Sequence, residues 1–568
     1  MAFFTKYVTM KNAVLFAMAV VVLYLCLVPL LTLLYSSFQT DFLLENPEWT
    51  FQHYIDAFTQ SSSLSMFYNS MLYGFWTMVC SMAVGVGIAW LFTRTNTPFK
   101  AFALLSSLVP MIIPGILSTI AWIFLASPQI GIINNMFEHL IGIRPFNIYS
   151  LAGMVFVQSL HLMPIAFIMA VAVFSSMDAS MEEAALASGA NQASAFGHIT
   201  ARLALPGLFS AALILFVETI SSFEVPQLIG VPNKTYVFVS QIYDELNRFP
   251  ANFGGAGALG MVILAIAFIG VVFSSRINSK GKRFATITGK GFKPALIDLG
   301  PWKWLGLAVY SAIFIIGVVL PLGVILWVSL LPSYEVPSME ALQKLTISNY
   351  ARIWDLHEIK STFMNSIQVS IITAFVVVFL TMTISYVTVK MRVRNGWLLD
   401  GLVFLPIAIP GIIMGVSVLF WYLVAPLPVP LYGTLTIIII AFVTMYLPFG
   451  MRFLSAGFVQ IKDELEEAAL VSGANFIQTF IWIYAPLLVP SILAAFIYIL
   501  IISLRQVSTA FFLVAQDNGL VAITIFNIWE DGFFVELAAL GVIMVVISII
   551  LVAIFQKIAG KFGMQRIG

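Results

Sequence analysis

Long apolar segments alternate with short polar connections along almost the whole chain. Each segment is close to the roughly 20 residues that an α-helix needs to cross the hydrocarbon core of a bilayer. The pattern therefore predicts an all-α membrane protein with twelve transmembrane helices. The predicted spans cover residues 13–35, 67–92, 101–126, 149–174, 206–229, 254–275, 304–330, 363–389, 398–424, 433–455, 488–513 and 534–556.

The composition points the same way. Hydrophobic residues make up 61% of the 568 residues and charged residues only 9%, whereas a soluble domain carries about 25% charged residues. The segment 13–35 is longer than the apolar region of a signal peptide, roughly 7–15 residues, and lacks a convincing cleavage site. We therefore expect it to remain as the first span. Cys26 and Cys80 both lie in apolar segments, which argues against a disulfide framework.

The distribution of Lys and Arg predicts the orientation, because cytoplasmic connections carry an excess of these residues. With the N-terminus inside, most of the 27 Lys and Arg residues fall in cytoplasmic connections. In the connections on the other side, acidic residues outnumber basic ones. We therefore expect a multi-pass membrane protein with both termini in the cytoplasm.

One polar connection occurs twice. The sequence from Glu182 to Pro206, EEAALASGANQASAFGHITARLALP, recurs from Glu466 to Pro490 as EEAALVSGANFIQTFIWIYAPLLVP. The motif Pro-x-x-x-Pro-Gly also occurs twice, at 110–115 and at 406–411. These repeats predict a chain built from two related halves.

The halves are expected at residues 1–275 and 304–568, joined by a basic cytoplasmic connector at 276–303. Each half contains six predicted spans. Because six is even, the halves share one orientation and are related by an axis along the membrane normal. The second half is shorter in one external loop, which follows its Pro-Gly motif.

The repeated connections face the cytoplasm in this topology and have helical character. Their alanines favour a helix, and one glycine in each copy interrupts it, which predicts a short helix, a turn and a second helix. A helix resting on lipid headgroups is the alternative, but two matching copies favour docking of a partner. The candidate docking residues are Glu182, Glu183, Ala184, Ala185 and Gly189 in the loop near 178–206, and Glu466, Glu467, Ala468, Ala469 and Gly473 in the loop near 462–490.

These loops resemble the EAA loop of permease subunits in binding-protein-dependent ABC importers of the type I fold. The family pattern of Glu-Ala-Ala, three residues, Gly, nine residues and Ile is matched by 183–199 and by 467–483. The resemblance implies two tandem six-helix permease repeats. It implies that each loop docks one subunit of a homodimeric ABC ATPase, which holds ATP and Mg. It also implies a periplasmic or lipid-anchored substrate-binding protein as a partner, and the bacterial inner membrane as the location.

The chain itself is not expected to be an enzyme. A phosphate-binding P-loop needs Gly-x-x-x-x-Gly-Lys-Ser/Thr, and none of the three Gly-Lys pairs, at 281, 289 and 560, is followed by Ser or Thr. The five histidines lack the spacing of metal ligands. We therefore expect no catalytic residues, no metal and no cofactor on this chain. We expect membrane lipid around it and no nucleic acid as a partner.

Three charged residues fall within the predicted fifth spans of the two halves: Glu218, Glu224 and Arg505. Charges within spans are costly and are usually paired or functional. An ion pair that holds the halves in register and a gate or transient substrate contact are both compatible with this pattern.

Several stretches, among them 223–230 and 503–506, resemble fused two-half permeases of the ferric iron type. Iron is therefore the expected substrate. The same machinery could serve an organophosphate or phosphonate, thiamine or a polyamine, because substrate choice in such systems lies chiefly with the binding protein. An ion-driven secondary transporter is the alternative from another class, since such proteins also often have twelve spans in two halves.

Overall fold

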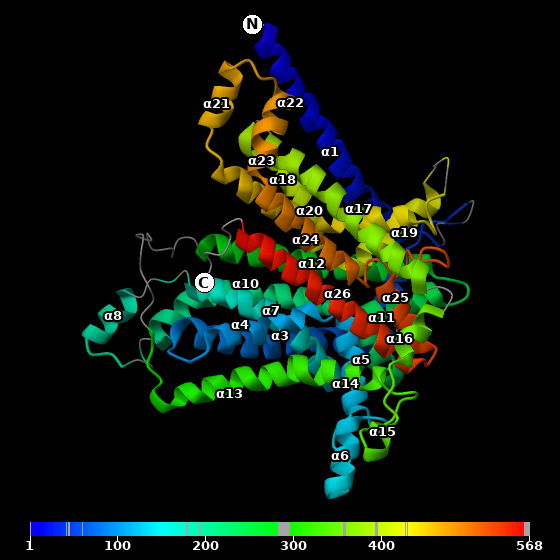
Figure 1. Ribbon diagram of the computed structural model, residues 1–568. Coiled ribbons are helices and arrows are strands. Elements are labelled where there is room, and N and C mark those ends of the chain that lie inside the picture. Colours follow the sequence, from blue (N-terminus) through cyan, green and yellow to red (C-terminus); the bar gives the residue numbers. More distant parts are fainter. Residues whose placement is uncertain are drawn as a thin grey trace.

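The computed structural model (Figure 1) describes residues 2–561 except 41–42, 44–45, 60, 176, 178–179, 192–193, 195, 282–295, 356–358, 392–395, 426–427 and 429. The described residues form helices and connections, with two isolated β-bridges and no strand. The first half contains α1 (Ala2–Ser36), α2 (Gln52–Thr59), α3 (Ser61–Arg94), α4 (Lys100–Leu108), α5 (Gly115–Ala126), α6 (Ile132–Ile141), α7 (Leu151–Ser175), α8 (Ser180–Ala187), α10 (Ala201–Ile220), α11 (Phe238–Asn247) and α12 (Phe253–Gly281). The second half contains α13 (Lys303–Phe314), α14 (Leu320–Ser329), α15 (Met339–Gln343), α16 (Ser348–Arg352), α17 (Ile359–Ser385), α18 (Gly396–Phe404), α19 (Gly411–Val424), α20 (Leu435–Gln460), α21 (Glu464–Val471), α22 (Phe476–Thr479), α23 (Ala485–Leu487), α24 (Val489–Leu504), α25 (Val521–Glu530) and α26 (Phe534–Lys561).

Nine helices in the described part of the chain are long and apolar enough to cross a membrane unaided. Three further spans are helix pairs that bend sharply at a short break. Counting each bent pair as one span gives the twelve spans that the apolar pattern predicts. The bent pairs are Lys100–Ile112 with Gly115–Ala126 (98°), Gly396–Ala408 with Gly411–Val424 (107°), and Phe480–Leu487 with Val489–Leu504 (66°).

The two sharpest bends lie at the repeated Pro-Gly motif. Ile113 and Ile409, which precede the second proline of each copy, have extended backbones with ψ of 124° and 118°. Proline disfavours the helical region for the residue before it and suits the start of a helix, where a free N–H is not needed. Helices α5 and α19 therefore begin in new directions just after Pro114 and Pro410. Eleven of the twelve residues of α5 and ten of the fourteen residues of α19 are buried.

The fifth spans end earlier than the apolar pattern predicts. The prediction of 206–229 is wrong at both ends, because the helix runs from Gly197 to Ile220. In the second half, 488–513 is replaced by the bent pair that ends at Leu504. The segment after Ile220 is apolar because it forms a buried turn at Pro226–Gly230. Hydropathy alone cannot separate such a buried turn from a continuing span.

The first helix of each half packs against the other half. Helix α1 contacts α18 and α19 of the second half, while α13 contacts α4 and α14 contacts α5 of the first half. Figure 1 shows α1 lying beside the yellow-green helices and α13 lying beside the blue ones. The hydroxyl groups of Tyr24 and Tyr422 are 3.1 Å apart, and the Trp421 indole donates to Tyr24 at 3.1 Å. The halves are therefore interlocked by exchanged helices.

Aromatic side chains fill the contact between the halves. The rings of Phe223 and Phe511 lie 4.5 Å apart, and Phe526 packs against both. A second group joins Phe124 of the first half to Tyr334 of the second, with ring centroids 5.0 Å apart. Buried apolar residues of both halves form one continuous core here. Because lipid is as apolar as this core, close van der Waals packing between the side chains is what favours association of the halves.

The longer connection of the first half forms helix α6. Its Arg144 side chain pairs with Glu138 at 2.6 Å and donates to the backbone oxygen of Pro128 at 3.0 Å. These contacts hold the pKa of the exposed Glu138 carboxyl below its ordinary value. In Figure 1, α6 projects from the bundle at the end opposite to α8 and α21. This helix accounts for the length difference between the halves that the repeat predicts.

Candidate functional site

The two repeated loops fold into the same local structure. Helix α8 ends before Gly189, and helix α21 ends before Gly473, with φ of +93° and +84°. In each copy the N–H after this glycine donates to the carbonyl oxygen five residues earlier at 3.0 Å, which is the Schellman arrangement of a helix C-terminus. The predicted helix, turn and second helix are therefore present in both halves. Figure 1 places α8 and α21 toward one end of the bundle, which we name the coupling end, and well apart from each other.

An ion pair attaches the first loop to the transmembrane bundle. The Arg94 guanidinium, at the end of α3, donates to the Glu182 carboxylate at 2.6 Å. The Thr200 hydroxyl, in the helical turn that leads into α10, donates to the same carboxylate oxygen. The Arg94 side chain is 2% exposed and that of Glu182 is 15% exposed. Glu182 thus joins α8 to two different membrane spans.

The connector between the halves also ends at this point. Ile297 donates its N–H to the Arg94 carbonyl at 2.8 Å and accepts from the Asn96 N–H at 3.1 Å. The Asn96 amide donates to Asp298 at 2.5 Å. Hydrogen bonds from the Gly300 N–H and from Asn96 lower the pKa of the Asp298 carboxyl. Residues 282–295 of the predicted connector lie outside the described part of the chain.

The second loop uses different chemistry at the matching positions. The Tyr484 hydroxyl donates to Glu466 at 2.7 Å, and the Tyr386 hydroxyl approaches the other carboxylate oxygen at 3.5 Å. Lys390, which matches Arg94 in the repeat, pairs with Asp463 at 2.6 Å instead. It also donates to the carbonyl oxygen of Ile461. Because Tyr484 matches Thr200, both loops bind their first glutamate from the same place in the following helix.

These contacts divide the predicted docking residues into two groups. Glu182 and Glu466 turn toward the bundle, and Ala469 is buried. The exposed members are Ala184, Gly189, Glu467, Ala468 and Gly473. Ala185 is half-buried, and the side chain of Glu183 lies outside the described part of the structure. Both loops therefore expose a small residue of the helix and the glycine of the turn, and the second loop also exposes Leu465, Glu467 and Val471.

Sequence reasoning missed the residues that hold the loops: Arg94, Thr200, Lys390, Tyr386 and Tyr484. A signal was available, because each cation follows the second or eighth span at the same position of its repeat. Comparing the halves over their whole length, and not only at the loops, would have paired Arg94 with Lys390 and Thr200 with Tyr484.

The three charged pathway candidates lie close to where the halves meet, but not as predicted. Glu218 is in the last turn of α10, whereas Glu224 and Arg505 come after the fifth spans have ended. No ion pair joins Arg505 to either glutamate among the described residues. The prediction that Glu224 and Arg505 lie within spans is therefore wrong, whereas Glu218 lies within its span as predicted. The reason is the early end of both helices.

Arg505 instead bonds to the backbone of the first half. Its guanidinium donates to the carbonyl oxygen of Met111, in the turn just before the break at Pro114. Glu224 is half-buried and hydrogen-bonds with Ser508 of the second half. The positive charge of Arg505 attracts the Glu224 carboxylate without a direct ion pair. The helix break supplies the acceptor, because a carbonyl next to a break has no helical N–H to accept from. Each half thus contributes a polar loop to one contact at the centre.

Aromatic and imidazole groups surround this contact. Tyr446 donates to the backbone oxygen of Ile502 at 3.5 Å, and the ring of Tyr498 packs against Phe453 at 5.5 Å. On the first half, His161 faces the start of α5 so closely that a Cβ at Gly115 would lie 3.7 Å from its ring. The described residues contain no group of three or more His, Cys, Asp or Glu that could hold a metal ion.

Comparison with known proteins identifies relatives across most of the chain. The family described as binding-protein-dependent transport system inner membrane component matches residues 81–280 and 386–561. The ferric transport system permease protein FbpB of Actinobacillus pleuropneumoniae is 27% identical over 87% of this chain and 71% of its own length. The Fe(3+)-transport system permease protein FbpB 2 of Haemophilus influenzae is 23% identical over 87% of this chain and 90% of its own length. Among solved structures, a bacterial alginate ABC transporter in complex with alginate pentasaccharide-bound periplasmic protein aligns with 16% identity over 48% of this chain and 95% of its own, with a TM-score of 0.39.

Proposed function

Because the chain belongs to the family of binding-protein-dependent transport system inner membrane components, we propose that it is the permease subunit of an ATP-driven importer for ferric iron. A separate solute-binding protein delivers the iron, and a separate dimeric ATPase supplies the energy. The observation that carries this proposal is the pair of equivalent loops, which present small exposed residues at one end of two interlocked halves.

The loop contacts explain how force would reach the membrane spans. Each subunit of the ATPase seats one loop, and closure of the ATPase dimer on ATP draws α8 and α21 together. The Arg94–Glu182 ion pair transmits the displacement of α8 to α3, and Tyr484 transmits that of α21 to the helix before α24. Rigid movement of this kind needs attachments that do not yield, and buried charge-assisted hydrogen bonds provide them.

The central contact is the candidate gate. The bond from Arg505 to the Met111 carbonyl joins the halves across the pathway. Separation of the halves must break it, leaving a cation and a carbonyl group available to a passing solute or to water. Closing the gate restores a bond whose two partners are otherwise costly to leave unsatisfied.

Two ferric transport permeases are 27% and 23% identical to this chain, each over 87% of its length. Their similarity supports iron as the substrate. Selection of iron is assigned to the binding protein, since the described part of the permease offers no cluster of metal ligands. The permease then needs only to pass an ion that its partner has already selected.

The proposal is tested by purifying a tagged copy from its native host and identifying the proteins that remain bound. An ABC ATPase is expected among them. The solute-binding protein encoded by a neighbouring gene is expected to bind ferric iron. Reconstituted with both partners, the permease should take up radioactive iron only with ATP. Uptake that persists without ATP and follows a proton gradient would contradict the proposal, and uptake of a phosphonate in place of iron would overturn the substrate alone.

The orientation has its own test. Val471, at the end of α21, is 90% exposed. With Cys80 replaced by serine, Val471→Cys is expected to react with an impermeant maleimide only when the cytoplasmic face is accessible, as in inverted vesicles. Labelling from the periplasmic side of intact spheroplasts would place the loops on the wrong side for an ATPase.

A further inference from the structure

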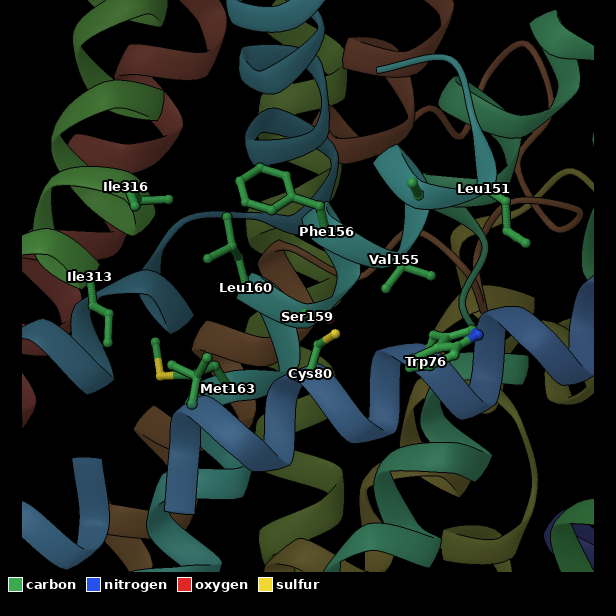
Figure 2. Close-up of a pocket in the computed structure, with 12 residues that line it drawn as sticks. Trp76, Cys80, Leu151, Val155, Phe156, Ser159, Leu160, Met163, Ile313 and Ile316 are labelled. Atoms are coloured by element: carbon green, nitrogen blue, oxygen red, sulfur yellow. The ribbon is translucent and has the colours of Figure 1, made fainter. Parts of the chain in front are cut away.

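A deep apolar groove opens between two spans of the first half and the first span of the second half. Its volume is about 760 Å³. One wall is formed by α3 and α7, and the other by α13 and the helical turn Ile315–Val319 that follows it. Figure 2 shows Trp76 and Cys80 on one side of the groove and Ile313 and Ile316 on the other. The lining residues are Trp76, Cys80, Val84, Leu151, Ala152, Val155, Phe156, Ser159, Leu160, Met163, Ile313 and Ile316.

The depth of the groove follows from helix geometry. At 1.5 Å per residue, Val84 lies about 15 Å and Trp76 about 27 Å along α3 from Arg94 at the coupling end. Since the hydrocarbon core is about 30 Å thick, the groove extends from near the midplane to the interface of the leaflet farther from the coupling loops. Leu151, at the start of α7, lies at the same far end. The groove is therefore at the depth of lipid acyl chains.

The lining excludes water and polar solutes. Its only oxygen-bearing side chain is Ser159, and this hydroxyl points to the Thr77 carbonyl at 3.5 Å. Phe156 packs edge-on against Trp122 with ring centroids 4.6 Å apart, which fixes that wall. Both Phe156 and Trp76 remain partly exposed beside the groove. An apolar cavity of this size gains nothing from water, which needs polar partners, but it gains from hydrocarbon.

The repeat supplies a contrast. In the second half, the place of α13 is taken by α1, which packs against α17, α19 and α20. Helices α13 and α14 repeat the contacts of α1 with the second and third spans, at α3, α4 and α5, but they make little contact with α7, which is the counterpart of α20. The five-residue turn at Ile315–Val319, with Pro321 after it, lies between α13 and α14 and packs against Pro110 at Gly317. The groove is thus formed where the exchanged helix passes α7 without packing closely against it.

We propose that this groove is a binding site for one phospholipid, whose acyl chain lies between the halves in the leaflet farther from the coupling loops. The lipid is expected to be held by its chain and not by its headgroup, because the lining carries no charge. Its two walls belong to different halves, so the bound chain forms part of the contact along which the halves move. The inference requires the membrane placement of the proposed function, and it does not depend on which substrate is carried.

The test uses the full chain in vesicles of phosphatidylethanolamine and phosphatidylglycerol that contain a phospholipid with a diazirine on its acyl chain. After illumination, mass spectrometry is expected to find adducts concentrated on peptides of α3, α7 and α13. Val155→Trp fills the groove and should lower these adducts several-fold. Phe375→Trp, on an exposed face of α17, is the matched control and should leave them unchanged.

A second measurement keeps the proposal falsifiable if Val155→Trp folds poorly. Cys80 lines the groove, whereas Cys26 is buried elsewhere in the core. A long-chain alkyl maleimide should modify Cys80 in delipidated protein, and added phospholipid should slow that reaction several-fold while Cys26 stays unmodified. Adducts spread evenly over all lipid-facing helices, protein–protein cross-links at the groove, or unprotected Cys80 would overturn the proposal. Loss of iron uptake would bear on the proposed function and not on this site.

Discussion

The first and second coupling loops have the same backbone and different attachments. Both end a short helix at a glycine with positive φ, and both turn the first glutamate of the repeat toward the bundle. In the first loop that glutamate meets a buried arginine and a threonine. In the second it meets two tyrosine hydroxyls, and the matching cation goes to a half-exposed aspartate. One sequence motif is thus fixed to the membrane domain in two ways.

The motif therefore determines the backbone shape of each loop, whereas side chains of the neighbouring spans determine how firmly the loop is attached to the bundle. Breaking a buried ion pair by removing one partner costs about 3–5 kcal/mol, because the remaining charge stays buried. In the second loop, Lys390 is 5% exposed but Asp463 is 52% exposed, so water solvates the carboxylate if the cation is removed, and pairs screened by solvent typically contribute about 1 kcal/mol or less. We therefore infer that the first loop is held more rigidly than the second, with the end of the connector braced against the same arginine.

The largest expected effect comes from Arg94→Ala. This change leaves the Glu182 carboxylate without its cation, and we expect the docked position of α8 to lose about 3–5 kcal/mol. Hydrogen exchange of the peptide 180–191 should speed up strongly, and ATP hydrolysis should lose its dependence on the loaded binding protein. Lys390→Ala is the matched control and should have a much smaller effect on 464–471. Equal effects of the two changes would refute the difference in stiffness.

The halves also differ at their centre, where Arg505 has only Ser221 as its counterpart in the repeat. Arg505→Ala removes the donor to the Met111 carbonyl, so we expect iron uptake to fall severalfold while the ATPase remains bound. Arg505→Lys keeps a cation and should retain part of the uptake. Both are measured in reconstituted vesicles, with co-purification of the ATPase as the control. Loss of the ATPase in both variants would assign Arg505 a purely structural role.

A smaller effect is expected when the second loop loses its shorter bond. Tyr484→Phe removes a hydrogen bond to a carboxylate, which is typically worth about 1.5–3 kcal/mol. Tyr386→Phe, whose hydroxyl lies 3.5 Å from the other oxygen, should matter less. Hydrogen exchange of 464–471 provides the measurement. If Tyr386→Phe has the larger effect, Tyr484 is not the principal attachment.

The smallest effect tests what the loops share. Gly189→Ala and Gly473→Ala force a residue with a Cβ into the left-handed region, at a cost of about 1–2 kcal/mol. Neither added Cβ would meet another atom within 4 Å, so the cost is purely conformational. Thermal unfolding of the purified complex should therefore shift by the same small amount in both variants. Unequal shifts would show that the two turns are not equivalent.

Features that depend on neighbouring residues or on a periodic pattern could be predicted from the amino-acid sequence. Apolar segment length specified twelve spans, and the repeated Ala and Gly residues specified two helical loops with identical turns. The proline motif marked both sharp bends, although it did not indicate that the helices after them would be buried. Each of these features depends on neighbouring residues or on the hydrophobic thickness of a bilayer, and both can be read along the chain.

Tertiary packing determined which residues meet although they are far apart in the sequence. It ended the fifth spans at Ile220 and Leu504, because many of the apolar residues that follow are buried by protein and not by lipid. In the folded protein, Arg505 donates to a backbone oxygen and not to a glutamate. Glu182 and Glu466 point toward the transmembrane bundle. Hydropathy measures only how strongly a residue avoids water, so it cannot distinguish lipid from protein as the surroundings. The central contact and the attachment of the loops both depend on which residues face protein, so neither could be predicted from hydropathy.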